Sequence, residues 1–258
     1  MSTFLFDSII FGPVWSRRLG ESLGINLLPA NNKLCTFNCV YCECGLTPKG
    51  STSSEFPAAG EVKNRLERKL IQMKENNEYL DSITFAGNGE PTLHPEFQRI
   101  MDDAIVARNF YYPKANIAVL SNATHIDRPD IFNALLKADL NILKLDSAIE
   151  KTLFTINCPR GNYSLSETIQ LIKQFHGKVI IQTLFLRGRY NGIYVDNTTE
   201  REVQAWLAAL EQIHPEMVMI YSIARDTAIQ GLESISQEEL EIIANRVSLA
   251  GIKTQVTP

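Results

Sequence analysis

Short apolar runs and longer amphipathic stretches alternate along most of the chain. Runs with the composition of strands occupy six stretches: 23–28, 82–86, 116–120, 141–145, 179–186 and 217–222. Between them, apolar residues recur three or four positions apart, as one buried face of a helix requires. The clearest sets are Val62, Leu66, Leu70 and Met73; Phe97, Ile100, Met101 and Ala104; Leu165, Ile169 and Ile172; and Val203, Trp206, Leu207 and Leu210. This repetition predicts an α/β fold with a parallel sheet, closed or partly closed into a barrel.

Capping signals support several of these helices. A serine or threonine followed three positions later by glutamate marks three helix starts, at Ser164, Thr199 and Ser236. The last of these predicts a helix over 236–250, and Pro95 suits the first position of another helix. The stretch 50–60 is rich in Ser, Pro and Ala, which predicts a surface loop.

The composition suits one large α/β domain. The chain has 258 residues, of which 45% are hydrophobic and 21% are charged, enough to form a full core. A net charge of -4 argues against general binding to nucleic acid or to acidic membranes. No stretch approaches the roughly 20 apolar residues that span a bilayer. Residues 1–11 carry no basic leader, so a cytoplasmic protein is expected.

The five cysteines form a poor disulfide framework and a good metal-site pattern, because four crowd into one loop and Cys158 stands alone. The spacing of Cys35, Cys39 and Cys42 can hold three corners of an iron–sulfur cube, which leaves the fourth iron open for a ligand. A zinc site with Cys44 as fourth ligand is the alternative, although Cys42 and Cys44 are close for a mononuclear site. Cys44 and Cys158 are otherwise expected to be free thiols.

Polar and glycine residues follow several predicted strands. They are Gly87, Asn88, Gly89 and Glu90 after the second strand, Ser121 and Asn122 after the third, and Lys144, Asp146 and Ser147 around the end of the fourth. In a parallel barrel the ends of the strands meet at one face, where ligands bind, and the cysteine loop follows the first strand. We therefore expect all these groups at one site. Ser, Asn and Asp also form turns and caps, so a purely structural role stays open for them.

The cysteine motif, with Tyr41 before its last cysteine, and the run from Gly87 to Pro91 resemble motifs of the radical S-adenosylmethionine (SAM) superfamily. Residues 11–20 and the triplet Lys144-Leu145-Asp146 are similar to a branch of uncharacterised iron–sulfur oxidoreductases related to the radical SAM enzymes of wyosine biosynthesis. The resemblance implies a partial (β/α)6 TIM-like barrel of parallel strands with outer helices. It also implies a single radical SAM domain over 1–258, with an N-terminal extension 1–21, a barrel core 22–222 and a helical C-terminal extension 223–258.

The resemblance further implies a [4Fe-4S] cluster on Cys35, Cys39 and Cys42, with SAM bound to the open iron. One-electron cleavage of SAM then yields a 5'-deoxyadenosyl radical, which abstracts a hydrogen atom from the substrate. The electron is expected from an external donor of the flavodoxin or ferredoxin type. The SAM site is expected to comprise Tyr41 near the adenine, Gly87, Asn88, Gly89 and Glu90 at the methionine moiety, and Ser121, Asn122, Asp146 and Ser147 at the ribose and carboxylate.

Basic residues are expected around the mouth of the barrel: Arg17 and Arg18 before the first strand, Lys144 at the fourth, Arg187 and Arg189 after the fifth, and Arg225 after the sixth. Arginine suits bidentate recognition of oxyanions, so an anionic small-molecule substrate is one hypothesis. Pairing of these arginines with surface acids is the alternative. Two other functions stay open: an activase acting on a partner protein, and a non-catalytic iron–sulfur or zinc module. The glycine-rich run after the second strand argues against the module.

Overall fold

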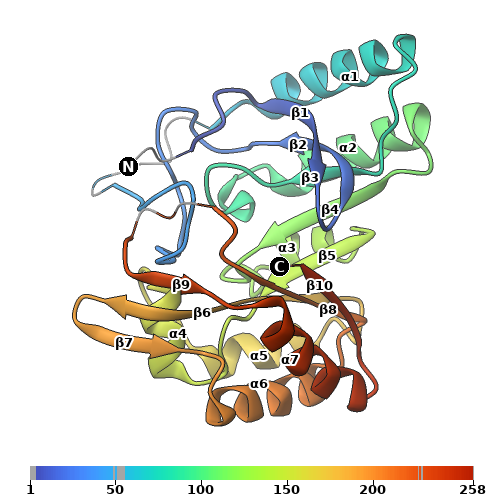
Figure 1. The fold of residues 1–258 in the computed structure, drawn as a ribbon. Helices are drawn as coiled ribbons and strands as arrows, with labels where there is room; N and C mark the ends of the chain where they lie inside the picture. The colour runs from blue at the N-terminus through green and yellow to red at the C-terminus, as the bar shows by residue number, and fades with distance from the viewer. Residues whose placement is uncertain (1–3, 49, 51–55, 226, 228, 258) are drawn as a thin grey trace.

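The computed structural model describes residues 4–48, 50, 56–225, 227 and 229–257. Its core is a sheet with the order β1-β2-β3-β4-β5-β6-β8-β10 (Figure 1). All neighbours from β2 to β10 pair in parallel, and β1 pairs with β2 in antiparallel orientation. The strands are β1 (Ile10–Ser16), β2 (Gly20–Ile25), β3 (Ser82–Phe85), β4 (Asn116–Ser121), β5 (Leu140–Lys144), β6 (Ile180–Tyr190), β8 (Met217–Ser222) and β10 (Lys253–Thr257). The path ends at β1 and at β10, so the described sheet is a partial barrel.

Helices cover the outside of this sheet (Figure 1). They are α1 (Ala59–Glu75), α2 (Phe97–Tyr111), α3 (Pro129–Leu135), α4 (Glu150–Asn157), α5 (Leu165–Lys173), α6 (Glu200–Ile213) and α7 (Gln237–Leu249), with a short 3-10 helix η1 (Pro91–Leu93). The four predicted apolar faces are buried against the sheet, apart from Leu207, which is half-buried. The three predicted caps are confirmed, since Ser164, Thr199 and Ser236 each accept a hydrogen bond from the backbone three residues later.

The sequence-based prediction needs correction at three places. Pro95 lies in a turn, because α2 begins at Phe97, and it is Pro91 that opens a helix, η1. The N-terminal extension contains β1. The C-terminal extension is more than helical, since β10 follows α7 and pairs with β8. Both strands are only partly buried. The apolar run of β1 is interrupted by Gly12-Pro13, and β10 is mostly polar, so neither shows the continuous apolar run that marks a central strand. Of the loop predicted over 50–60, residues 51–55 lie outside the described part.

Strand β6 continues beyond the barrel as an arm. It pairs there with β7 (Ile193–Asp196) and β9 (Leu232–Ser234), both antiparallel. The link between β6 and β7 is Asn191-Gly192, with φ of 50° and 79°, as a two-residue hairpin turn requires. The predicted strand stopped at residue 186, because the exposed arm lacks an apolar run. The Asn-Gly pair is the sequence signal that marks it.

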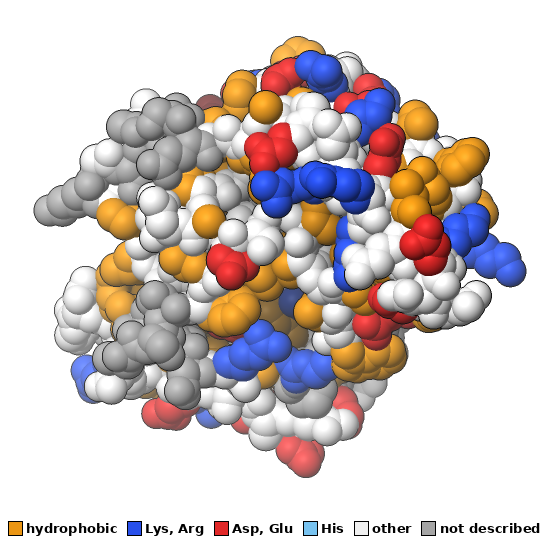
Figure 2. All heavy atoms as spheres, turned by 90° about the horizontal axis from the view of Figure 1, so that it is seen from above, with side chains coloured by type: hydrophobic (Ala, Val, Ile, Leu, Met, Phe, Trp, Pro, Cys, Tyr) orange, Lys and Arg blue, Asp and Glu red, His pale blue; other side chains and the backbone are white. Residues whose placement is uncertain are grey.

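The surface carries both signs of charge. Figure 2 shows one face, which is hollowed near its centre, with hydrophobic side chains in the hollow and both basic and acidic side chains around it. Within the described residues, no helix is both long enough and apolar enough to cross a membrane.

The burial of α1 predicts a clear contrast between two adjacent positions. Leu70 is fully buried, whereas Ile71 on the next position is 40% exposed. We expect Leu70→Ala to lower the free energy of unfolding by about 2–5 kcal/mol, because it leaves a cavity in the core. Ile71→Ala is the matched control and is expected to cost less than about 1 kcal/mol. Urea denaturation of both variants measures the difference, and equal losses would contradict the assignment of the buried face.

Candidate functional site

The cysteine loop is fixed against the turn that follows β3. The Leu34 N–H donates to the carbonyl of Asn88 (2.9 Å), and the Glu90 N–H donates to the carbonyl of Leu34 (3.1 Å). Gly89 lies at the centre of this contact with φ of +144°, and a Cβ there would come within 1.8 Å of the Leu34 carbonyl oxygen. Gly87 has φ of +146°, and a Cβ there would come within 2.4 Å of the Asn26 side-chain oxygen. Both positions therefore need glycine for the loop and the turn to meet.

The predicted cluster cysteines and the glycine turn share one cavity. It has a volume of about 240 Å³ and is lined by Cys35, Cys39, Cys42 and Cys44, by Gly87, Gly89, Glu90, Ser121 and Asn122, and by Lys33, Phe37, Tyr41, Ala86, Leu120, Lys144 and Gln182. We call this space the first cavity. Within the described residues, no three Cys, His, Asp or Glu side chains are arranged to hold a single metal ion. The three cysteines that the sequence singled out thus surround a space that opens on glycine backbone.

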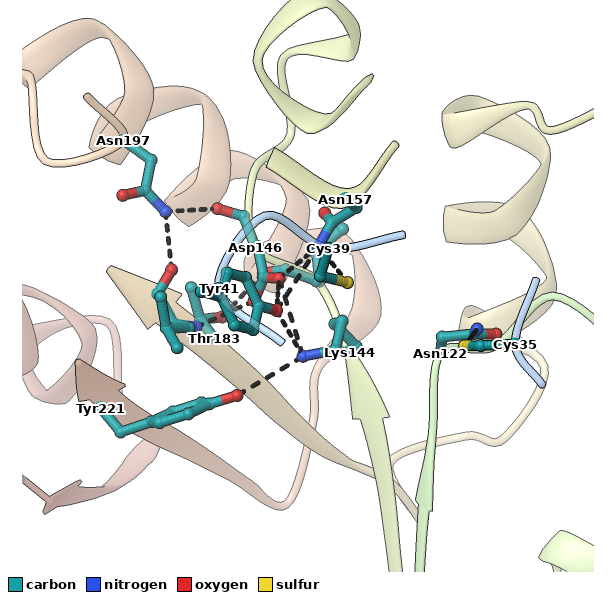
Figure 3. Close-up of polar contacts among 12 residues, drawn as sticks. Cys35, Cys39, Tyr41, Asn122, Lys144, Asp146, Asn157, Thr183, Asn197 and Tyr221 are labelled. Atoms are coloured by element: carbon teal, nitrogen blue, oxygen red, sulfur yellow. Dashed lines mark hydrogen bonds and ion pairs between the residues drawn. The ribbon is translucent and has the colours of Figure 1, made fainter. Parts of the chain in front are cut away.

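Hydrogen-bond donors point at two of the cysteine sulfurs (Figure 3). The Cys35 Sγ accepts from the Phe37 backbone N–H (3.4 Å) and from the side-chain amide of Asn122 (3.5 Å). The Cys39 Sγ accepts from the side-chain amide of Asn157, the last residue of α4 (3.4 Å). Donors of this kind stabilise cluster-bound thiolates, so the donor set fits an iron–sulfur cluster. Sequence analysis missed Asn157, because nothing local links it to a cysteine 118 positions away.

Lys33 is a second residue that sequence analysis missed. Its side chain is buried, with 3% of the residue exposed, and its ammonium donates to the Gly45 carbonyl (2.8 Å) and to the Cys42 sulfur. Burial opposes its charge, but the nearby sulfurs of Cys42 and Cys35 outweigh this effect and raise the pKa of Lys33. A cation therefore lies beside the cysteines. Its position two residues before Cys35 is the only sequence signal.

The cysteines themselves differ in environment. Burial raises the pKa of Cys35 to about 12 and also raises the pKa of Cys39. The hydrogen bond from Cys44 to the Cys42 sulfur, aided by the charge of Lys33, lowers the pKa of Cys42 below its usual range despite its burial. The Cys44 thiol also contacts the Gly87 carbonyl oxygen at 3.6 Å. Cys44 is thus a hydrogen-bond donor at the edge of the first cavity, whereas Cys158 lies outside its lining.

A buried polar network lies behind Tyr41 (Figure 3). The Tyr41 hydroxyl donates to the Asp146 carboxylate and accepts a hydrogen bond from Lys144 Nζ (2.7 Å). The same carboxylate accepts from the Asn157 amide (2.6 Å) and from the Leu184 backbone N–H (2.9 Å), and Lys144 lies 3.7 Å away. Burial acts against the charge of Lys144, but Asp146, Tyr221 and Cys39 together outweigh this effect, so the pKa of Lys144 is raised. Asp146 is therefore occupied by protein donors and positions Tyr41.

Of the other residues predicted to bind SAM, three line the first cavity. Glu90 is buried and accepts hydrogen bonds from Thr92, from the Ser121 hydroxyl (2.8 Å) and from the Asn122 backbone N–H (2.7 Å). It therefore joins the turn after β3 to the end of β4. Ser121 and Asn122 present their remaining surface to the cavity.

Three predicted residues are not in the lining of the first cavity. One is Asp146, whose carboxylate is occupied behind Tyr41. The Asn88 side chain bonds to the backbone of Phe6 and Pro29, and so it fixes the N-terminal segment. The Ser147 hydroxyl donates to Glu202 on α6 (2.7 Å). A sequence motif alone does not specify where such side chains point.

A second cavity of about 370 Å³ adjoins the first. Among its lining residues are the arginines Arg17, Arg18 and Arg225, and it shares with the first cavity Tyr41, Cys42, Cys44, Ala86, Gly87 and Leu120. The structure therefore brings three of the predicted basic residues to one space, and Lys144 to the neighbouring one. Arg187 and Arg189 lie on the arm, where Arg187 pairs with Glu239 (2.5 Å) and Arg189 contacts the Tyr194 ring. Neither of them lines either cavity.

Comparison with known proteins identifies related sequences. The family model of the radical SAM superfamily matches residues 33–201. A UPF0026 protein of Methanocaldococcus jannaschii is 36% identical over 184 residues, which cover 69% of this chain and 54% of the relative. This chain thus spans about half the length of that relative.

Solved structures share the fold. A radical SAM methyltransferase from Sphaerobacter thermophilus has a TM-score of 0.66 at 14% identity, over 92% of this chain and 65% of the other. Archaeal TYW1 has a TM-score of 0.55 at 13% identity, over 88% of this chain and 71% of the other. These similarities confirm the expected α/β partial barrel.

The network behind Tyr41 predicts unequal effects for its two charged members. Asp146→Ala removes the acceptor of three hydrogen bonds and leaves the partly buried Lys144 ammonium without its ion pair, so we expect a loss of about 3–5 kcal/mol in the free energy of unfolding. Lys144→Met removes the ion pair and keeps the three hydrogen bonds to the carboxylate, so its cost is expected to be smaller. Urea denaturation of both variants tests this order. A larger loss for Lys144→Met would contradict the central role of the carboxylate.

Proposed function

Because this chain belongs to the radical SAM superfamily, we propose that it cleaves SAM reductively and uses the resulting radical to abstract a hydrogen atom from a substrate. A [4Fe-4S] cluster and SAM are the cofactors of this family. When bound, they supply one-electron cleavage of SAM to methionine and a 5'-deoxyadenosyl radical. The observation that carries the proposal is the first cavity, where Cys35, Cys39 and Cys42 face the backbone of Gly87 and Gly89.

Three cysteines and their donors would hold the cluster. Cys35, Cys39 and Cys42 are the proposed ligands, and the side-chain amides of Asn122 and Asn157 donate to two of the sulfurs. Lys33 places positive charge beside the third, which offsets the negative charge that thiolates bring into a buried site. Cys44 is proposed to remain a free thiol.

The remaining walls of the first cavity would hold SAM. We assign the methionine moiety to the exposed backbone at Gly87 and Gly89, since no side chain separates it from the cysteines. Ser121 and Asn122 offer polar surface on the adjoining wall, and the Tyr41 ring is assigned to the adenine side. Tyr41 is kept in place by Asp146 and Lys144. Holding the Tyr41 ring in one position suits a site that must shield a radical.

The electron and the substrate come from outside the chain. We propose an external one-electron donor of the flavodoxin or ferredoxin type. A small molecule is the favoured substrate, because the second cavity, at about 370 Å³, has the size of a small-molecule site and directly adjoins the first. The three arginines that line it favour an anionic substrate.

SAM cleavage is the direct test. Protein reconstituted anaerobically with iron and sulfide, then reduced and given SAM, is expected to form 5'-deoxyadenosine and methionine in equal amounts. Both products are measured by liquid chromatography with mass spectrometry, and omission of the reductant is the control. Absence of both products from protein with a full iron content would contradict the proposal.

Cysteine variants test the ligand assignment. Cys39→Ala is expected to lose the cluster, seen as loss of brown colour and of at least half of the bound iron, because two thiolates hold a cube poorly. Cys44→Ala and Cys158→Ala are matched controls that remove a thiol of the same chain and are expected to keep the colour. A colourless Cys44→Ala protein would show that Cys44 is a ligand.

A further inference from the structure

We propose that the second cavity is the substrate site and that Arg18 anchors an anionic group of the substrate, a carboxylate or a phosphate. The inference rests on the proposed function, since it assigns the molecule that the radical attacks. Beyond the proposed function, it names one anchoring residue and the anionic group that this residue recognises. It also predicts that the rest of the ligand is apolar.

The guanidinium of Arg18 is the main observation. It stacks over the Tyr221 ring, with 4.4 Å between Cζ and the ring centroid, so its plane is fixed. Its Nη1 is buried and has no hydrogen-bond partner among the described residues. A buried donor on a charged group costs free energy when it has no acceptor. Binding of an oxyanion would supply the acceptor and remove this cost. Arg18 lines the second cavity, which gives such an anion a place.

The charge balance of the second cavity also favours an anion. Its described lining contains three guanidinium groups, from Arg17, Arg18 and Arg225, and a single carboxylate, that of Glu43. Glu43 forms an ion pair with Arg225 at 3.0 Å, on the exposed side. On the Arg18 side of the cavity, none of the described lining residues is acidic.

The walls of the cavity predict the rest of the ligand. Phe4, Phe6, Leu184 and Ile223 supply apolar surface, which suits a hydrocarbon or aromatic body. Its lining also includes Tyr41, Cys42 and Gly87, which line the first cavity as well. A ligand anchored at Arg18 would therefore extend toward the cysteines and toward the site assigned to SAM, as hydrogen abstraction requires.

Two small anions serve as probes of this site. Benzoate and phenyl phosphate carry a carboxylate or a phosphate on an apolar ring, and benzamide is the neutral analogue. Their binding is measured by anaerobic calorimetry on unreduced protein that holds both its cluster and SAM. We expect at least one anion to bind ten-fold or more tightly than benzamide, and the preferred anion identifies the chemistry.

Variants of Arg18 decide whether it is the anchor. Arg18→Met and the polar, uncharged Arg18→Gln are expected to reduce anion affinity at least ten-fold and to leave benzamide affinity unchanged. Two variants guard against the failure of one to fold. Arg99→Met is the matched control, because Arg99 is exposed on α2, where it pairs with Glu96; it is expected to bind as the wild type does.

Three results would overturn the inference: no preference of the wild type for either anion over benzamide, full anion binding by both Arg18 variants, or anion binding that SAM abolishes. The last would mean that Arg18 serves SAM itself. Failure of the proposed function is seen separately, since it shows as absence of 5'-deoxyadenosine from reduced wild-type protein, whereas the binding measurement requires no SAM cleavage.

Discussion

A carboxylate that is shielded from water must find its partners within the protein, and Asp146 finds three hydrogen bonds and one ion pair, from four segments of the chain. Tyr41 comes from the cysteine loop, Lys144 from β5, Asn157 from the end of α4 and the Leu184 N–H from β6. Asn157 also donates to the Cys39 sulfur, so the network that links the strands of the barrel also fixes the position of one cysteine. The geometry of the cysteine loop is therefore tied to the packing of the sheet rather than to the loop sequence alone.

Features that depend on residues close together in the sequence were predictable. The buried face of α1 and the caps at Ser164, Thr199 and Ser236 depend on residues within one or two turns, and they were confirmed. The cysteine spacing and the glycine turn were also local, and the structure brings them to one cavity. Side-chain direction was not predictable, since Asn88 and Ser147 sit in the expected turns but bond to other segments and do not line the cavity. Nor were Lys33 and Asn157, whose roles come from partners that the fold supplies.

The arginines show the same limit in another form. Six basic residues were predicted to lie near strand ends from their positions in the chain. The sequence pattern, however, did not locate the end of β6 correctly. Because β6 runs on into the arm, Arg187 and Arg189 leave the barrel with it, and Arg187 meets Glu239. Arg18 reaches the second cavity through the turn of the β1–β2 hairpin, a hairpin that the apolar pattern did not reveal. Pairing with an acid was the better expectation for Arg187, whereas Arg189 lies over the Tyr194 ring.

The N-terminal segment is part of the site and not an accessory to it. The Asn88 side chain holds the backbone of Phe6, the Phe6 ring stacks on Phe11, and Phe11 lies against Gly24 of β2, where a Cβ would collide with its ring. Phe6 and Arg18 both line the second cavity. The motif after β3 thus acts on both sides of its backbone: the glycines face the cysteines, while the asparagine between them secures the wall of the neighbouring cavity. A substitution at Asn88 would act on that wall through Phe6, without any contact to the first cavity.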